Sequence, residues 1–169
     1  MIKKNDTEIA RQIALNHLQV LDTPEDQAYD DITRMAAHVC GTPIALISLS
    51  DHDRQWFKSR VGLQIMEIPR EHGFCDTACQ SPHEVTIVRD TLKDKRFSSH
   101  PLVTQDPFFR FYAGVPLLTV DGHAIGTICV IDRMPMELNA KQLEKLQFMA
   151  RQVMVMLESR AVAQAWQSE

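Results

Sequence analysis

The sequence has no long apolar run, no excess of positive charge and no repeated segment. No stretch approaches the roughly 20 apolar residues of a membrane helix, so we predict no membrane partner. The two lysines near the start are not followed by an apolar segment, and we therefore expect no signal peptide. A net charge of −4 offers no basic surface to a nucleic acid. Four scattered cysteines, without an export signal, indicate reduced thiols and a cytoplasmic location.

Common catalytic signatures are also missing. There is no Gly-x-Ser-x-Gly elbow, no glycine-rich phosphate loop and no His-Glu-x-x-His pair, so we predict no catalytic residue. Four possible zinc ligands do cluster in the sequence: His72, Cys75, Cys79 and His83. On one helix these side chains spread along the axis and cannot surround an ion, so we predict that the cysteines share no metal. We also predict no internal disulfide, because the Cys75 and Cys79 side chains would run parallel on one helix. Activation of Cys75 by a neighbouring histidine is the less favoured alternative.

The length and composition fit one globular domain. The chain has 169 residues, of which 44% are hydrophobic and 24% are charged. This is enough chain to bury a substantial core. We therefore predict a single domain over residues 1–169, with a core from about 11 to 160.

The segment 109–132 is expected to form the central hairpin. It consists of two apolar runs around Asp121-Gly122, a pair typical of two-residue turns whose central positions both have positive φ. We assign Gly114 and Gly126 to the face under the helices, with Ile128 and Val130, because glycine permits close approach. The opposite face is then expected to present Phe109, Phe111, Ala113, Thr127, Cys129 and Ile131.

Other elements follow from periodicity and capping residues. Helices are predicted over 6–20, over 24–40 after an N-cap at Thr23 and with a stop at Gly41, over 75–80, and from a capping box at Asn139 to about 165. Strands are predicted over 43–50, 54–60 and 85–90. The polar stretch 91–107 is expected to be a binding loop.

Several short motifs support a family assignment. The runs FRFYAG-PL and G--IGT-CVID, preceded by RQWFKS--GL and FC, resemble the GAF domains of bacterial signalling proteins from about Arg11 to Arg160. The resemblance implies an α+β domain with a central antiparallel sheet. Terminal helices would lie on one face, and loops with short helices would enclose a small ligand on the other.

The resemblance further implies a regulatory module in bacterial signal transduction that binds a small molecule or a protein partner without catalysis. One alternative is a thiol-dependent reductase of the free methionine sulfoxide type, but residues 98–109 lack the cysteine that such relatives carry. Another alternative is a structural dimerisation unit without a ligand.

Specific ligands of related domains receive little support. The Asn-Lys-Phe-Asp-Glu motif of cyclic-nucleotide binders is missing, and Cys75 and Cys79 are not followed by the histidine of bilin-binding relatives. The cofactor stays unknown, with a non-covalent tetrapyrrole left open. Because the chain ends soon after the closing helix, we expect either a fragment or a separate output partner such as a histidine kinase or a diguanylate cyclase.

We place a ligand on the hairpin face away from the terminal helices. Its floor is apolar, Phe74 and Phe97 are walls, and Asp90 and Arg96 are polar contacts. The full set of predicted ligand-binding residues is Phe74, Cys75, Asp90, Arg96, Phe97, Phe109, Phe111, Ala113 and Cys129. Aromatic residues at these positions are also compatible with a plain core.

The closing helix carries two apolar stripes. One can cover the sheet and runs through Leu143, Leu146, Ala150, Val153 and Leu157. The other needs a partner and contains Phe148, Met149, Val155, Met156 and Val162. We therefore predict a homodimer formed through the first and last helices.

Overall fold

The computed structural model describes residues 3–168, and for residues 3–5 and 72 it describes the backbone alone. A six-stranded antiparallel sheet with the order β3-β2-β1-β6-β5-β4 forms its centre. The strands are β1 (Ile44–Ser50), β2 (Arg54–Val61), β3 (Glu67–Pro69), β4 (Thr86–Val88), β5 (Phe111–Leu118) and β6 (Ala124–Asp132). The helices are α1 (Lys3–His17), α2 (Gln27–Cys40), α3 (Phe74–Cys79), α4 (Pro101–Thr104) and α5 (Ala140–Gln167), with 3-10 turns η1 (Arg70–His72) and η2 (Thr91–Lys93).

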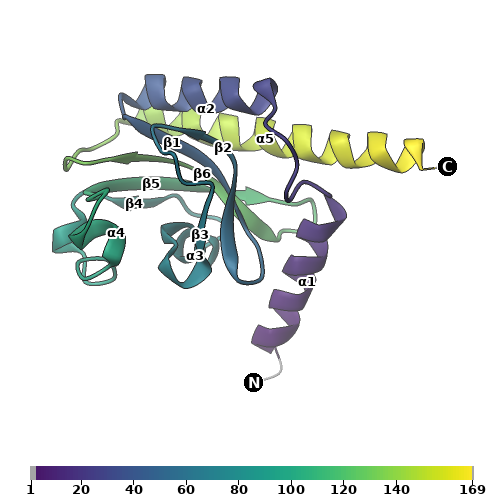
Figure 1. Cartoon of the computed structure of the whole chain (residues 1–169), viewed down its shortest axis with the longest axis horizontal. Helices are drawn as coiled ribbons and strands as arrows, with labels where there is room; N and C mark the ends of the chain where they lie inside the picture. Colours follow the sequence, from purple (N-terminus) through teal and green to yellow (C-terminus); the bar gives the residue numbers. More distant parts are fainter. Residues whose placement is uncertain (1–2, 169) are drawn as a thin grey trace.

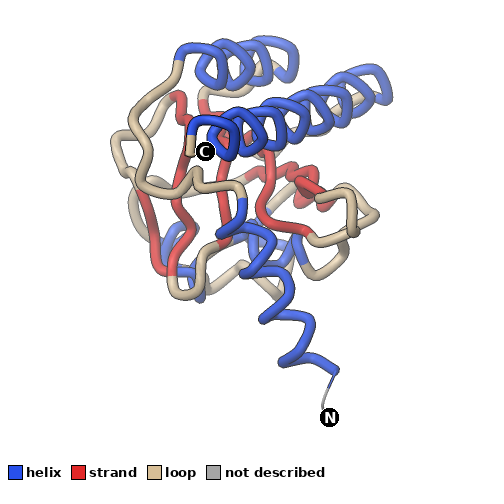
Figure 2. Tube along the Cα trace, turned by 90° about the vertical axis from the view of Figure 1, so that its right-hand side faces the viewer, coloured by secondary structure: helices blue, strands red, loops and turns tan. Residues whose placement is uncertain are grey.

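The elements form three layers. Helices α2 and α5 lie side by side over one face of the sheet, and the short helices α3 and α4 lie beneath the other (Figures 1 and 2). This arrangement confirms the predicted α+β fold. Helix α1 lies across one end of the sheet, where Arg11 Nη1 donates a 2.6 Å hydrogen bond to the carbonyl of Ser50 (Figure 1).

Each face of the sheet has its own core. The upper core, under α2 and α5, includes Ala36, Trp56, Phe111, Ala113, Val115, Ile128, Val130, Leu146, Met149, Val153 and Leu157. The lower core, over α3 and α4, consists of Ile44, Leu46, Phe57, Phe74, Cys75, Ala78, Val88, Phe97, Val103, Phe109, Tyr112, Cys129 and Ile131. The first apolar stripe of α5 is therefore buried as predicted. Met149 belongs to that buried face and not to the exposed stripe.

The strand faces confirm the prediction for β6 and contradict it for β5. Ile128 and Val130 face the helices and Cys129 faces away, as expected. Phe111 and Ala113 were placed on the wrong face, because Ala113 pairs directly with Val130 and opposite residues of an antiparallel pair share a face. Gly126 lies on the face under the helices as predicted, because its partner Leu49 belongs to the upper core, whereas Gly114 pairs with Cys129 and lies on the lower face. Neither glycine marks close approach of a helix. A Cβ at Gly114 would meet Tyr112 Oη, and one at Gly126 would meet the backbone of β1.

The hairpin turn is longer than predicted. The connection covers residues 119–123, and the Thr119 N–H donates to the His123 carbonyl at 2.9 Å. Within it, Gly122 has a φ of +84°, whereas Asp121 is not among the residues with positive φ. The pair Asp121-Gly122 therefore marks the turn correctly, but the two-residue turn type is wrong.

The helix ends show which capping residues are used. Asp26, and not the predicted Thr23, caps α2 by accepting a 2.9 Å hydrogen bond from the Ala28 N–H. Thr23 instead donates to the Val20 carbonyl. The predicted left-handed stop at Gly41 is confirmed by its φ of +66°. The predicted capping box at Asn139 is also confirmed.

Short elements occupy the predicted loop 91–107 and the segment that follows β2. Strand β3 and turn η1 lie within residues 61–74, and η2 and α4 lie within residues 91–107. Along residues 3–168, no helix combines the length and the apolar character that crossing a membrane requires.

Candidate ligand site

A strip of small polar side chains runs through the middle of the lower sheet face. This buried polar strip consists of Ser48, Ser50, Gln55 and Thr127, all with no exposed surface. Ser48 and Ser50 both donate to Gln55 Oε1, at 3.1 and 2.9 Å. Because β1 pairs Ser48 with Thr127 of β6, three strands contribute to one continuous polar surface.

Helix α3 covers this strip. The Cys79 thiol donates to the Gly126 carbonyl at 3.5 Å and lies 3.8 Å from Ser50 Oγ. One turn earlier, Tyr112 Oη donates to Cys75 Sγ at 3.6 Å. These weak sulfur contacts add to the burial of Phe74, Cys75 and Ala78, which packs the six residues of α3 against the sheet. We infer that α3 is the element that must move to open the strip.

Two polar groups of the strip lack partners. Among the described residues, no group meets the geometry of a hydrogen bond with Gln55 Nε2 or Thr127 Oγ1; the Thr127 hydroxyl only lies near enough to the Cys75 thiol to help lower the pKa of that thiol. An unsatisfied buried polar group costs roughly 1–3 kcal/mol. One amide donor and one hydroxyl are therefore available beneath α3.

The thiols around the strip differ in acidity. A hydrogen bond from Cys129, helped by neighbouring hydroxyls, lowers the pKa of Cys75 from 9.0 to about 6. The same contact raises the pKa of Cys129, and burial raises that of Tyr112. Burial also raises the pKa of Cys79 to about 12. Cys75 is therefore the most acidic thiol of the lower core.

An aromatic cluster adjoins the strip. The rings of Phe74 and Phe97 stack with centroids 4.3 Å apart, and Phe109 and Tyr112 contact Phe74 from other sides. A cavity of only about 20 Å³ lies beside them, lined by Leu46, Phe57, Leu63, Ile65, Ile68, Phe74, Cys75, Leu102, Phe109, Tyr112 and Ile131. This space accommodates one molecule of the size of water. A larger ligand requires displacement of α3 or of the segment 63–68.

The structure brings together five of the nine predicted ligand-binding residues. The lower core contains Phe74, Cys75, Phe97, Phe109 and Cys129. Phe111 and Ala113 lie in the upper core, for the pairing reason given above.

The two predicted polar contacts have partners of their own, although the Arg96 guanidinium also lies 5.2 Å from the centre of the Phe97 ring. Asp90 caps η2 through the Leu92 N–H and pairs with Arg110 at 3.1 Å. Arg96 is exposed and pairs with Asp94 at 2.7 Å. Local ion pairs near the surface therefore engage both side chains.

Sequence reasoning missed the polar strip itself. Ser48 and Ser50 sit in an otherwise apolar strand, and their spacing of two places them on one face. Thr127 and Cys129 repeat that spacing on β6. This alternation of small polar residues was the available signal.

Among the described side chains, no three His, Cys, Asp or Glu residues are grouped as metal ligands. His72 lies outside the described side chains, and His83 lines a groove above the sheet.

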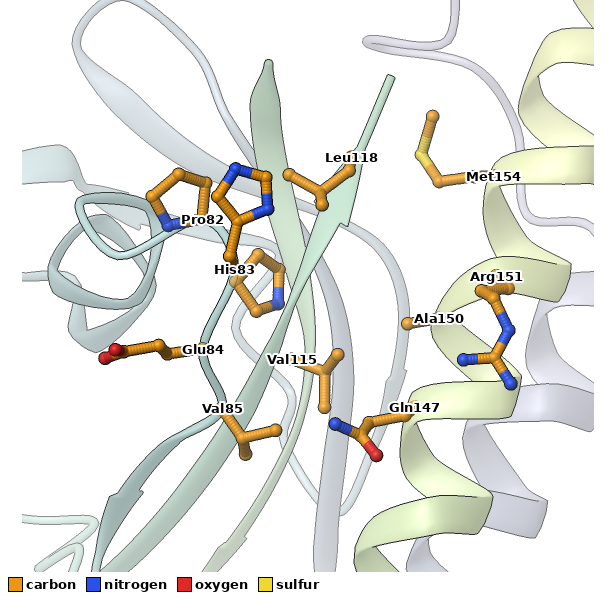
Figure 3. Close-up of a pocket in the computed structure, with 11 residues that line it drawn as sticks. Pro82, His83, Glu84, Val85, Val115, Leu118, Gln147, Ala150, Arg151 and Met154 are labelled. Atoms are coloured by element: carbon orange, nitrogen blue, oxygen red, sulfur yellow. The ribbon is translucent and has the colours of Figure 1, made fainter. Parts of the chain in front are cut away.

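That groove is a second hollow of about 350 Å³. Figure 3 shows Gln147, Arg151 and Met154 of α5 on one side of it, with β5 and the segment 82–85 on the other. Its polar residues His83, Glu84, Gln147 and Arg151 are all exposed. Water already solvates them, so this groove has no unmet polar groups comparable to those of the strip.

The six-stranded antiparallel sheet, with paired helices on one face and short helices on the other, defines an α+β domain of the kind seen in solved GAF domains. The GAF domain family model matches residues 24–157, and the chain therefore belongs to the GAF domain family. As a GAF domain it is a regulatory sensory module.

One curated relative is a cyclic di-GMP phosphodiesterase from Pseudomonas aeruginosa. It is 39% identical over 155 residues, which cover 91% of this chain and 26% of that protein. The chain thus spans about a quarter of the length of this relative.

The solved structures that share the fold include the following two. The GAF domain of an Acinetobacter phosphoenolpyruvate-protein phosphotransferase has a TM-score of 0.66 and 16% identity, covering 87% of this chain and 93% of that one. A type II free methionine-R-sulfoxide reductase from Thermoplasma acidophilum has a TM-score of 0.64 and 13% identity, covering 79% and 92%. At such identities the likeness concerns the fold alone. The reductase alternative is therefore the weaker interpretation.

Proposed function

We propose that this GAF domain binds a small uncharged polar molecule on the buried polar strip and communicates its occupancy through α3. The observation that supports the proposal is the pair of unpartnered groups, Gln55 Nε2 and Thr127 Oγ1, in a fully buried position. A ligand that carries a hydrogen-bond acceptor and a neighbouring polar atom would satisfy both. Hydrogen bonds from the ligand to these two groups would offset the free energy that it costs to bury them without partners.

The charges around the strip favour an uncharged ligand. Its four side chains are neutral, and Cys75 beside it is an acidic thiol that disfavours an anion. Arg11 reaches the end of the strip at Ser50, but Glu8 already pairs with its guanidinium at 2.8 Å. A buried charge without a partner costs far more than a buried neutral group.

A route from the strip to the surface runs through Arg70. Its Nε donates to Asp76 of α3 at 2.9 Å, and its Nη1 donates to Glu8 of α1 at 2.6 Å. If α3 moves to admit a ligand, the Arg70–Asp76 contact changes, and with it the ion pair between Arg70 and Glu8 of α1. In this proposal α1 carries the signal to other parts of a larger protein.

The relative suggests the output. We propose that the module regulates a partner or neighbouring domain that acts on cyclic di-GMP, as the named activity of the 39% identical relative indicates. A histidine kinase or a diguanylate cyclase, as predicted from the sequence, is the other candidate. The module itself performs no chemistry on the nucleotide, so the purified chain is expected not to hydrolyse cyclic di-GMP.

We further propose that the module is a homodimer. Phe148, Val155 and Val162 recur every seven residues on α5 and are each more than half exposed. Trp166 extends the same exposed stripe. A seven-residue repeat of apolar residues is typical of helices that pair side by side.

Two threonine variants test the ligand site. Thr127 and Thr33 are both fully buried, but the Thr33 hydroxyl donates to the Tyr29 carbonyl at 2.9 Å whereas that of Thr127 is unpartnered. Thr33→Val should lower the free energy of unfolding by about 1 kcal/mol, and Thr127→Val should leave it unchanged or raise it. Denaturant unfolding of both variants measures this difference.

Native mass spectrometry then tests binding in the same variants. We expect a small molecule to accompany the wild-type chain and Thr33→Val but to be lost from Thr127→Val. If Thr127→Val keeps the molecule, or destabilises the fold as much as Thr33→Val does, the strip is not the ligand site.

A further inference from the structure

The exposed stripe of α5 has two different flanks. On one flank, Met149 and Met156 each follow a stripe residue by one position and pack into or against the upper core. On the same flank, Gln142 Nε2 donates to the Val39 carbonyl of α2 at 3.1 Å. This flank of α5 is therefore covered by the chain itself.

The other flank carries two opposite charges. Arg151 and Glu158 each follow a stripe residue by three positions, so they lie on the same side of α5. This side borders the groove of about 350 Å³ that Gln147, Arg151 and Met154 line (Figure 3). The groove leaves room for another chain beside this flank.

Both charges are available to a partner. Among the described side chains, neither Arg151 nor Glu158 forms an ion pair. The Arg151 guanidinium lies only over the Phe148 ring, 6.0 Å from its centre. Seven positions separate Arg151 from Glu158, which is about 10 Å along the helix axis, so they cannot pair within one helix.

One register of an antiparallel pair of α5 helices gives both charges a partner. In an antiparallel pair the same flank of both helices comes together, so Arg151 of one copy meets Glu158 of the other, twice in each dimer. The midpoint between Arg151 and Glu158 falls beside Val155. The same register therefore brings the two Val155 residues together and places Phe148 opposite Val162 of the second copy. The apolar stripe and the charges agree on this register.

A parallel pair does not achieve this. It brings opposite flanks together, so Arg151 and Glu158 would face the flank of the second copy that carries Met149 and Met156. That flank is already covered by α2 and the upper core and offers no charge at these two positions. The charge pattern therefore favours the antiparallel orientation.

We propose that two copies of this chain pair through α5 in antiparallel orientation, fixed by two ion pairs between Arg151 of one copy and Glu158 of the other. The proposal rests on the homodimer proposed above and adds its orientation and the residues that set it. The C-terminal half of each α5, which extends beyond its own sheet, lies along the domain of the second copy (Figure 1). Trp166, which is 76% exposed in one chain, is then at the level of Leu143 of the second copy.

Charge reversal tests the orientation by sedimentation velocity. Arg151→Glu alone and Glu158→Arg alone should each weaken dimerisation at least about tenfold, because like charges then meet twice in each dimer. The double variant exchanges the two charges and should recover the wild-type dissociation constant to within about threefold. Lys93→Glu, at an exposed position in η2, is the matched control and should dimerise as wild type does.

Cysteine cross-linking gives a second readout that does not depend on affinity. Glu144 and Ala165 lie on the charged flank, and the proposed register places Glu144 beside Ala165 of the second copy. Within one helix these positions are about 30 Å apart, so a link between them must join two chains. The chain with both Glu144→Cys and Ala165→Cys should yield, after mild oxidation, a dimer linked from position 144 to position 165.

The outcomes separate the orientation from the homodimer itself. Links between equal positions, an unchanged dissociation constant in Arg151→Glu, or a double variant that stays as weak as the single variants would each overturn the antiparallel pair while the homodimer stands. A wild-type chain that is a monomer at tens of micromolar concentration would overturn both. Circular dichroism of each variant verifies that a lost dimer is not a lost fold.

Discussion

Arg70 Nη1 lies 2.6 Å from Glu8 Oε1 and joins two residues that are 62 positions apart in the chain. The same carboxylate accepts from Arg11 at 2.8 Å, so Glu8 is held between two guanidinium groups. Arg70 also contacts Asp76 of α3. These contacts join the first helix, the end of the sheet and the helix over the polar strip in one network of charges.

This network predicts an acid-sensitive contribution to stability. Hydrogen bonds from Arg11 and then from Arg70 lower the pKa of Glu8 from 4.5 to about 2. Because the folded pKa lies below the unfolded one, the stabilisation is complete above about pH 4.5 and is lost as the pH falls towards 2. The side chain is 40% exposed, so we expect a loss of about 1 kcal/mol or less in Glu8→Gln at neutral pH.

Denaturant unfolding of wild type and Glu8→Gln between pH 2 and 7 measures this contribution. The two stability curves should converge at the acid end and separate above about pH 4.5. Glu144→Gln, an exposed position on α5, is the control and should follow the wild-type curve throughout. If the free energies of unfolding of Glu8→Gln and wild type differ by the same amount at all pH values, ionised Glu8 does not make the proposed contribution.

A second prediction concerns Gly126. A Cβ at this position would collide with the Ser48 carbonyl and approach the Leu49 Cα, both of which belong to the backbone of β1. The hydrogen-bonded backbone of β1 cannot move aside to relieve this clash, as a flexible side chain could. Gly126→Ala should therefore lower the free energy of unfolding by at least about 3 kcal/mol.

Gly122→Ala is the matched control at the hairpin tip. Nothing lies within 4 Å of a Cβ there, and the φ of +84° is the only obstacle. This strain should cost about 1 kcal/mol. Chemical denaturation that gives equal losses for both variants would show that β1 accommodates the methyl group of Gly126→Ala.

Local signals explain why much of the fold could be predicted. The stop at Gly41 and the capping box at Asn139 depend on residues within one turn of helix, so the sequence displays them directly. The faces of β5 could not be obtained by treating glycine as a marker of helix packing. Pairing of Ala113 with Val130 decides those faces, and pairing is a long-range property.

The candidate site was harder to predict for a related reason. Its polar atoms come from three strands that meet only in the folded sheet, and each serine looks incidental within its own strand. Asp90 and Arg96 seemed suitable because they carry charge near the aromatic residues. In the structure Asp90 pairs with Arg110, and Arg96 pairs with Asp94. The sequence contains several possible partners for each charge and does not show which one is used.

The last prediction concerns the exposed stripe of α5. Phe148, Val155 and Val162 are each more than half exposed. The C-terminal half of α5 extends beyond the sheet (Figure 1). Val155 is the middle residue of this stripe, so a charge there would be buried without a partner in a helix pair. Val155→Glu should convert the proposed homodimer to a monomer at tens of micromolar concentration, with little change in secondary structure.

Sedimentation velocity decides this prediction with Val120→Glu as the matched control. Val120 is 89% exposed at the hairpin tip, so the same substitution there changes the net charge equally without touching α5. Val120→Glu should therefore remain a dimer. If the wild-type chain is a monomer at these concentrations, or if both variants stay dimeric, α5 does not form the interface. A dimer lost only in Val155→Glu would place the two α5 helices side by side, as their seven-residue spacing requires.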